Sequence, residues 1–244
     1  MKYRLETIPV YRAYETNAEC PLCVLDRRAE AGYVQFFLGS SVMAPEMRVE
    51  VNKHGFCARH FRMLYEAEGK LGLALMTHTY LTAVAAEQAR LERRARGWPK
   101  RGRRRRIAEL SRQLRRTRAS CMICPRMEAT AKRYAFTVVH NWERDDAFRR
   151  MLLSSRGFCM EHYALCMDMA AEVLGEGSLR RWCEEVTELQ ARNRADMLEG
   201  LATFASRFDY RHSGGDWEGQ RHAVPRAIQQ VAGALMVDSE DLGE

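Results

Sequence analysis

The chain has 244 residues, of which 46% are hydrophobic and 29% charged, a balance typical of folded globular proteins and one that excludes disordered or collagen-like chains. Its formal net charge of +7 is unevenly spread, because residues 90–118 hold fourteen Lys or Arg and two Glu. The remainder of the chain is therefore mildly acidic. The longest run without a charge, Leu71 to Ala86, is shorter than the roughly 18 apolar residues of a membrane span, so we interpret it as a buried helix.

The chain contains an internal repeat. CPLC at Cys20 to Cys23 recurs as CMIC at Cys121 to Cys124, and HGFCARHF from His54 recurs as RGFCMEHY from Arg156. Chance repetition of this order and spacing is improbable. We infer four regions: a first copy at 1–90, a basic linker at 91–117, a second copy at 118–205, and a C-terminal helix and acidic tail at 206–244.

Apolar residues recur at three- and four-residue intervals in both copies, which predicts α-helices. The predicted helices are 24–38, 45–52, 58–67 and 71–96 in the first copy, 127–142, 145–154, 160–174 and 178–204 in the second, and a docked terminal helix at 217–235. Strand-like alternation is scarce. We therefore predict an all-α protein of duplicated helical units, in which the long final helices of the two copies pack beside each other about an internal pseudo-two-fold axis.

Each copy contains three cysteines and one histidine in the order C-x2-C and C-x2-H, with gaps of 33 and 34 residues between the pairs. Three thiolates and one imidazole form the closed tetrahedral shell that suits structural zinc. The spacing predicts one zinc ion in each copy, each acting as a staple within its own copy. The predicted ligand sets are Cys20, Cys23, Cys57 and His60 for the first copy, and Cys121, Cys124, Cys159 and His162 for the second.

Other metal and redox chemistry is disfavoured. CPLC resembles a thioredoxin-like redox pair, but no βαβ pattern surrounds it and CMIC lacks the proline. Iron–sulfur clusters usually take four cysteines. A catalytic zinc keeps one coordination position open, whereas four protein ligands would fill this shell.

The remaining polar candidates have ordinary structural interpretations. We expect Cys166 and Cys183 to be small buried hydrophobes, His78 to be a core histidine, and the residues from His140 to Asp146 to form a solvated helix junction. His54 adjoins the first ligand set, but Arg156 takes its place in the second copy. We expect Phe56 and Phe158 to bury their rings against the metal sites.

The basic segment has two interpretations. It can be a solvated linker that holds two halves apart by self-repulsion. It can instead bind phosphates without sequence preference, because only Trp98 offers a stacking surface nearby. The nucleic-acid-binding residues would then be Arg101, Arg103, Arg104, Arg105 and Arg106.

The C-terminal segment also has two interpretations. It can be a docked terminal helix with an aromatic anchor, followed by an acidic tail at 237–244 that is frayed. Alternatively, Asp209, Arg211 and Glu218 can present a recognition surface beside Tyr210 and Trp217.

The motifs as a set resemble an uncharacterised prokaryotic family, one of the domains of unknown function. The segments that carry the resemblance are ETIPV at Glu6 to Val10, ECPLC at Glu19 to Cys23, the two GFC-x2-H motifs, RFDYRH at Arg207 to His212, and WEGQ at Trp217 to Gln220. The resemblance covers nearly the whole chain and implies an intracellular, mostly helical protein with two sites of three cysteines and one histidine. It implies no activity.

We therefore expect a cytoplasmic, non-enzymatic binding or scaffold protein with two zinc ions per chain, a protein partner and no membrane association. Neither a secretion signal nor a catalytic motif is apparent. The alternatives are a nucleic-acid-associated protein that uses residues 90–118, and a thiol-redox or metal-handling protein. The sequence does not indicate an oligomeric state.

Overall fold

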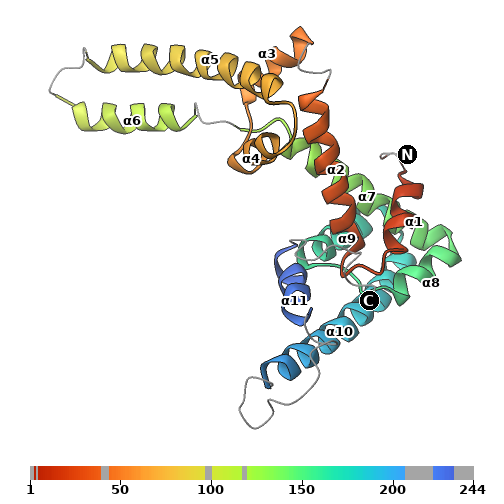
Figure 1. Ribbon diagram of the computed structural model, residues 1–244. Helices are drawn as coiled ribbons and strands as arrows, with labels where there is room; N and C mark the ends of the chain where they lie inside the picture. The colour runs from red at the N-terminus through yellow and green to blue at the C-terminus, as the bar shows by residue number, and fades with distance from the viewer. Residues whose placement is uncertain are drawn as a thin grey trace. The chain divides into compact units, whose positions relative to one another are not determined.

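The computed structural model describes residues 3, 5–39, 44–96, 101–116, 120–206 and 222–233, and its regular elements within these ranges are all α-helices (Figure 1). The prediction of an all-α protein is confirmed for this part of the chain. Within the same ranges, no helix is both long enough and apolar enough to cross a membrane.

The helices form two compact units that do not coincide with the two sequence copies. Unit 1 consists of residues 1–29 and 128–244, and unit 2 consists of residues 30–127. Unit 2 is thus inserted into unit 1 along the chain, and the boundaries fall within α2 (Pro21–Leu38) and α7 (Cys124–Arg144).

Unit 1 holds α1 (Thr7–Tyr14), the first half of α2, most of α7, and four later helices. These are α8 (Asp146–Ser154), α9 (Met160–Val173), α10 (Glu176–Ser206) and α11 (Ala223–Ala232). Unit 2 holds the rest of α2, the start of α7, and α3 (Pro45–His54), α4 (Ala58–Glu66), α5 (Lys70–Arg96) and α6 (Arg103–Arg116).

Helix boundaries follow local residue chemistry. Pro21 and Pro45 are the first residues of α2 and α3, where a fixed φ and a missing N–H carry no penalty. Gly55 ends α3 with φ of 61°, a conformation that favours glycine. Asp145 caps α8, because its carboxylate accepts hydrogen bonds from the backbone N–H groups of Ala147 and Phe148 at 2.9 and 3.1 Å.

Unit 1 has an aromatic core. Trp142 and Trp182 are fully buried and meet edge to face, with ring centroids 5.1 Å apart. The Trp142 indole donates a hydrogen bond to Glu185 at 2.9 Å, and Arg149 pairs with the same carboxylate. Cys20, Cys23 and Cys159 belong to this core, so the first part of α2 and the start of α9 meet inside it.

Unit 2 has a smaller core built on phenylalanines. Phe37, Phe56 and Phe61 stack edge to face in succession, at 5.1 and 5.5 Å between ring centroids. Cys121 and Ile123 belong to the same cluster. Phe56 and Phe158, each directly before the cysteine of a C-x2-H motif, are both buried as predicted.

The expectation that residues 71–86 form a buried helix is wrong. The segment lies in α5, but Leu71 is 76% exposed, Leu81 is 61% exposed, and His78 is exposed and not a core residue. The main neighbours of α5 are α3, α4 and α6, and among its residues Leu73, Met76 and Leu91 are buried.

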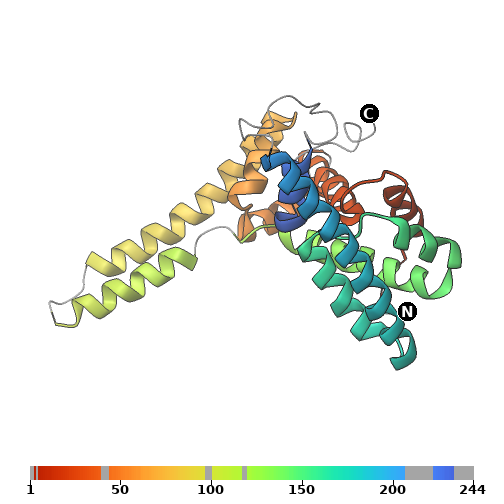
Figure 2. The ribbon, with the colours of Figure 1, turned by 90° about the horizontal axis from the view of Figure 1, so that it is seen from below.

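The basic segment is largely helical. α5 and α6 lie side by side as a helical hairpin in both views (Figures 1 and 2), and α6 lies wholly within the segment expected to be a linker. We call residues 90–96 and 101–116 the arginine hairpin. It forms part of unit 2. The predicted packing of α5 beside α10 about a two-fold axis stays a prediction.

The terminal helix is shorter than predicted but docked as expected. α11 covers Ala223–Ala232 and packs against α9 and α10, burying Ala223, Gln229 and Gln230. Asp209, Tyr210, Arg211, Trp217, Glu218 and the acidic tail lie outside the described residues.

Candidate metal centres

Unit 1 contains the first cluster, which we call site A: Cys20, Cys23, Cys159 and His162. The Nδ1 atom of His162 lies 3.4, 3.4 and 3.2 Å from the sulfur atoms of these cysteines in that order. The Cys23 and Cys159 sulfurs are 3.6 Å apart. All four residues are buried.

Unit 2 contains the second cluster, site B: Cys57, His60, Cys121 and Cys124. The Nδ1 atom of His60 lies 3.2 Å from the sulfurs of Cys57 and Cys121 and 3.5 Å from that of Cys124. The Cys57 and Cys124 sulfurs are 3.8 Å apart. His60 and Cys121 are buried, whereas Cys57 is half-buried and Cys124 is exposed.

The predicted grouping of these eight residues is therefore wrong, although all eight lie in the two clusters. Each C-x2-C pair of one copy meets the C-x2-H pair of the other, not that of its own copy. Cys23 and Cys159 are 136 positions apart along the chain. The two gaps of 33 and 34 residues suggested closure within each copy, but the fold exchanges the C-x2-C pairs.

The distances fit a tetrahedral metal shell. With bonds of about 2.3 Å to sulfur and about 2.0–2.1 Å to nitrogen, ligand atoms around zinc lie about 3.6–3.8 Å apart. The observed separations of 3.2–3.8 Å fall close to this range in both clusters. In each cluster all four ligand atoms lie within 4.8 Å of one another. Both clusters could thus hold a metal ion.

A carboxylate orients each histidine. Nε2 of His162 faces Asp26 Oδ2 at 3.0 Å, and Nε2 of His60 faces Glu30 Oε1 at 2.9 Å. These contacts hold Nδ1 toward the sulfurs and raise the basicity of the ring, as carboxylates commonly do for metal-binding histidines. Asp26 and Glu30 both lie on α2, one on each side of the unit boundary. Sequence reasoning missed both residues.

The two C-x2-H motifs share one local structure. Gly55 and Gly157 have φ of 61° and 78°, and Cys57 and Cys159 then take the extended conformation of a helix N-cap residue. The histidine follows in the first turn. These ligands therefore lie at the positive end of the helix dipole, which favours thiolate over thiol.

The two C-x2-C motifs differ, because the prolines stand at different places. Pro21 follows the first cysteine, and α2 begins there. Pro125 follows the second cysteine of the other pair, and α7 begins at Cys124. Cys121 consequently precedes the helix, with φ of 132°, and its sulfur accepts a hydrogen bond from the Ile123 N–H at 3.4 Å.

Close contacts shift the pKa values of several groups in both clusters. Burial alone would lower the pKa of His60, but Glu30 and the neighbouring thiol groups outweigh burial and raise that pKa to about 9. In site A, hydrogen bonds from Cys20 and Cys23 lower the pKa of Cys159 despite its burial. Burial alone would raise the pKa of the Glu30 carboxyl, but His60 and Arg59 outweigh burial, and the pKa is lowered overall. Other thiols of the clusters shift the opposite way, because neighbouring cysteines raise the pKa of Cys23, and burial and Cys121 raise that of Cys124 to about 12.

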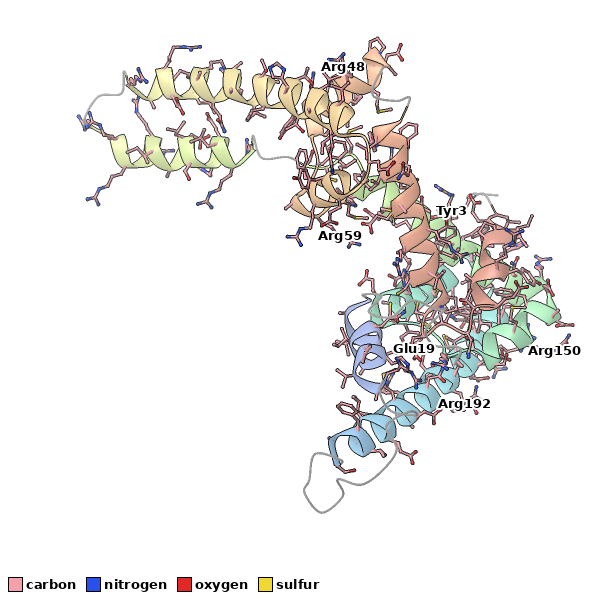
Figure 3. All side chains as sticks on the ribbon, in the orientation of Figure 1. Tyr3, Glu19, Arg48, Arg59, Arg150 and Arg192 are labelled. Atoms are coloured by element: carbon pink, nitrogen blue, oxygen red, sulfur yellow. The ribbon has the colours of Figure 1, made fainter. Side chains whose placement is uncertain are left out.

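Hydrogen bonds and ion pairs brace both ligand pairs of site A. Glu19, directly before Cys20, is buried and pairs with Arg156 at 2.5 Å and with Arg226 of α11. Gln190 of α10 holds the backbone of Phe158, accepting from its N–H at 2.8 Å and donating to its carbonyl at 2.9 Å. In Figure 3, Glu19 lies between the N-terminal end of α2 and α11.

The other sequence candidates fall as follows. Cys166 is fully buried in the core of unit 1, as predicted, and burial raises the pKa of its thiol, while Cys183 is half-buried. His54 is exposed and lies 3.0 Å from the Ser120 hydroxyl, beside site B. Asp145 marks a helix junction as expected, since it caps α8 and accepts a hydrogen bond from Tyr11.

In the part of the chain that the structure describes, the regular elements are all helices, and they carry two clusters of three cysteines and one histidine. The chain belongs to a family of unknown function, DUF6062, whose family model matches residues 1–238. No curated protein and no solved structure matches it.

Proposed function

We propose that the protein binds two zinc ions as structural staples, one in each unit, and serves as a non-enzymatic binding protein. The observation that carries this proposal is the convergence of four ligand atoms within 4.8 Å in both clusters. Zinc fits the donor set better than other metals, because mixed thiolate and imidazole ligands at tetrahedral spacing are typical of it.

Four protein ligands would complete each zinc shell and leave no position for a substrate or an activated water. This supports a structural role over hydrolysis at the metal. The staples would also contribute to folding outright, since each joins helices from distant parts of the chain. Site A joins α2 to α9, and site B joins the start of α4 to the start of α7.

Paired substitutions test both the metal and the grouping. Elemental analysis of the purified chain should give two zinc ions. The variant Cys20→Ser/Cys159→Ser removes two ligands of one site and should retain one zinc ion. The variant Cys20→Ser/Cys57→Ser damages both sites and should retain none. The reverse pattern would mean that the ligands group within each copy, and a metal-free parent chain would refute the proposal.

An apolar groove in unit 1 supports a protein partner. It has a volume of about 470 Å³ and lies between α9, α10 and α11. Met160, Leu198 and Val231 line it and are 60, 62 and 67% exposed. Arg194 contributes a positive charge to the same lining. We infer that it takes an amphipathic helix of a partner protein, with apolar residues in the groove and an acidic residue beside Arg194.

Comparative purification from the native cell tests this inference. The variant Leu198→Glu/Val231→Glu places two negative charges in the groove, which would disfavour contact with the apolar and acidic residues of the partner helix. This variant should lose the proteins that accompany the parent chain. Leu81→Glu, at an exposed position on α5, is the matched control and should keep them. If both variants retained the same proteins, the groove would not be the binding surface.

Nucleic acid is the second candidate partner, supported by the exposure of Arg101, Arg103, Arg104, Arg105 and Arg106 on the arginine hairpin. The basic surface also extends along the hairpin. A cavity of about 540 Å³ in unit 2 is lined by Lys53, Arg90, Arg94 and Arg116 among others. Such a surface would bind phosphates without reading bases.

Binding to random-sequence DNA and RNA at several salt concentrations tests this candidate. The variant Arg104→Gln/Arg105→Gln/Arg106→Gln should weaken binding. It should also reduce the steepness of the plot of log binding constant against log salt concentration by about 0.7–0.9 for each phosphate that an arginine no longer neutralises. Arg180→Gln/Arg181→Gln, at exposed positions on α10, should leave binding unchanged. The absence of binding to either polymer at low salt would exclude this function.

A further inference from the structure

The two candidate metal centres differ in their exposure to solvent. In site A the four ligands are all buried, and Cys20 and Cys159 have no exposed surface. In site B, Cys57 is half-buried and Cys124 is exposed. The identical donor sets therefore face different environments.

Site A is covered by the end of α11. The Cys23 thiol lies 3.5 Å from the carbonyl oxygen of Gly233, which caps that helix. A methyl group at Gly233 would lie 3.5 Å from the Cys159 sulfur, so the backbone packs closely over the thiols. Arg226 of α11 pairs with the buried Glu19 beside Cys20, which anchors the cover.

Site B is closed by loop contacts on one side. The N–H groups of Ser120 and Met122 donate to the carbonyls of His54 and Gly55, both at 2.9 Å, and so join the loop of Cys121 to that of Cys57. Cys121 belongs to the same buried apolar cluster as Phe56 and Met122, and His60 is buried as well. The side of Cys57 and Cys124 faces solvent, and their sulfurs lie 3.8 Å apart.

We propose that the Cys57 and Cys124 pair of site B is a modification site that reacts with hydroperoxides, forms a disulfide and releases zinc from site B alone. The inference rests on the proposed zinc binding. It follows from access, because a thiolate reacts with an oxidant only where the oxidant can reach the sulfur.

The chemistry takes two displacements. The Cys124 thiolate attacks one oxygen of the hydroperoxide, the O–O bond breaks, and a sulfenic acid forms as hydroxide or alkoxide leaves. The Cys57 thiolate then attacks that sulfur, the S–S bond forms, and the S–O bond breaks with loss of hydroxide. With hydrogen peroxide and two protons, the products are one disulfide and two waters. The zinc ion loses two of four ligands.

The experiment uses the full chain loaded with two zinc ions. Hydrogen peroxide is added, released zinc is followed with a colorimetric chelator, and disulfides are mapped by mass spectrometry after alkylation. One zinc ion per chain should be released, together with a disulfide between Cys57 and Cys124. A thiol reductant and added zinc should restore the site.

Two variants separate this reaction from general damage. Cys124→His removes the exposed thiol of the pair and offers an imidazole in its place, so the zinc that this variant binds in site B should be released more slowly under the same peroxide. Cys183→Ala removes a half-buried cysteine outside both sites and should behave as the parent chain.

Should peroxide release both zinc ions together, or release neither from a chain that holds two, this inference fails while the proposed zinc binding stands. Loss of zinc from Cys124→His at the parental rate would also overturn it. A chain that holds no zinc before oxidation refutes the proposed function itself.

Discussion

At the scale of single residues, the carboxylates behind the histidines carry a testable role. Replacing Asp26 by Asn or Glu30 by Gln keeps the shape of each side chain but removes its charge. Because these groups hold the ring that faces the thiols, zinc affinity should fall by about 10–100-fold at the affected site. Competition with a chromogenic chelator measures the zinc affinity of each site.

Each substitution serves as the control for the other, since Asp26 contacts site A and Glu30 contacts site B. Equal weakening of both sites by either variant would argue against local orientation of the ring. Unaltered zinc affinity in both variants would mean that neither carboxylate contributes to zinc binding.

Gly157 supports a second residue-scale prediction. It has φ of 78°, and an added Cβ would lie 2.1 Å from Gln190 Oε1, the atom that accepts the hydrogen bond of Phe158. Gly157→Ala should therefore destabilise the protein by about 1–3 kcal/mol in urea unfolding. Gly200→Ala, in open space within α10, should instead stabilise it by about 0.5–1 kcal/mol. Equal effects at both positions would contradict this account.

The sequence indicated the eight cysteines and histidines because their pattern repeats. It did not indicate Asp26 and Glu30, since single acidic residues on a helix surface are common and the partner histidines lie 136 and 30 positions away. Only the fold brings each carboxylate to its ring.

At the scale of helices, Glu185 of α10 holds α7 and α8 together through Trp142 and Arg149. Burial raises the pKa of this carboxyl, but Arg149 and Trp142 outweigh burial and lower it below its ordinary value. A carboxyl with a lowered folded pKa stabilises the protein above its unfolded pKa of about 4.3, and this stabilisation is lost as pH falls through the folded value.

Glu185→Gln should therefore destabilise the protein by about 1–2 kcal/mol near pH 7. The difference from the parent chain should shrink as pH falls below about 4.5, where the parental carboxyl also becomes protonated. Thermal melts of both proteins across this range measure the difference. A difference that does not change with pH would assign the effect to packing.

Most helices could be predicted from the sequence, because prolines, glycines and apolar spacing mark their ends. α1 (Thr7–Tyr14) was not among the predicted helices. Two other differences, the helical state of α6 and the exposure of α5, have physical causes. In α6 the arginines outnumber the apolar Ile107, Leu110 and Leu114, so the segment resembled a linker. In α5 the absence of charge suggested burial, but the helix has too few neighbours to cover Leu71 and Leu81.

At the scale of the whole molecule, each unit contains one complete site, so damage at one site should loosen one unit. Cys121→Ser should accelerate backbone hydrogen exchange across residues 51–64 and 120–127, which surround site B. Exchange in α9 and α10 should stay slow, because site A remains intact. Cys20→Ser should give the opposite pattern, and uniform acceleration by either variant would contradict the assignment of one staple to each unit.

The exchange of the C-x2-C pairs could not be predicted, because both groupings place compatible ligands together and only tertiary packing chooses between them. The units likewise cut across the copies, since unit 1 takes its first pair from the N-terminal copy and its second from the C-terminal copy.

The nesting of one site within the other has a consequence for how the nascent protein assembles. Cys124 leaves the ribosome before Cys159 and His162. All four ligands of site B are therefore available while site A still lacks half of its ligands. Closing a link between Cys57 and Cys124, 67 positions apart, roughly halves the chain that separates Cys23 from Cys159 and reduces the entropy cost of the outer closure by about 0.6 kcal/mol. A polypeptide released after residue 90 would carry two unmatched half-sites and no finished one.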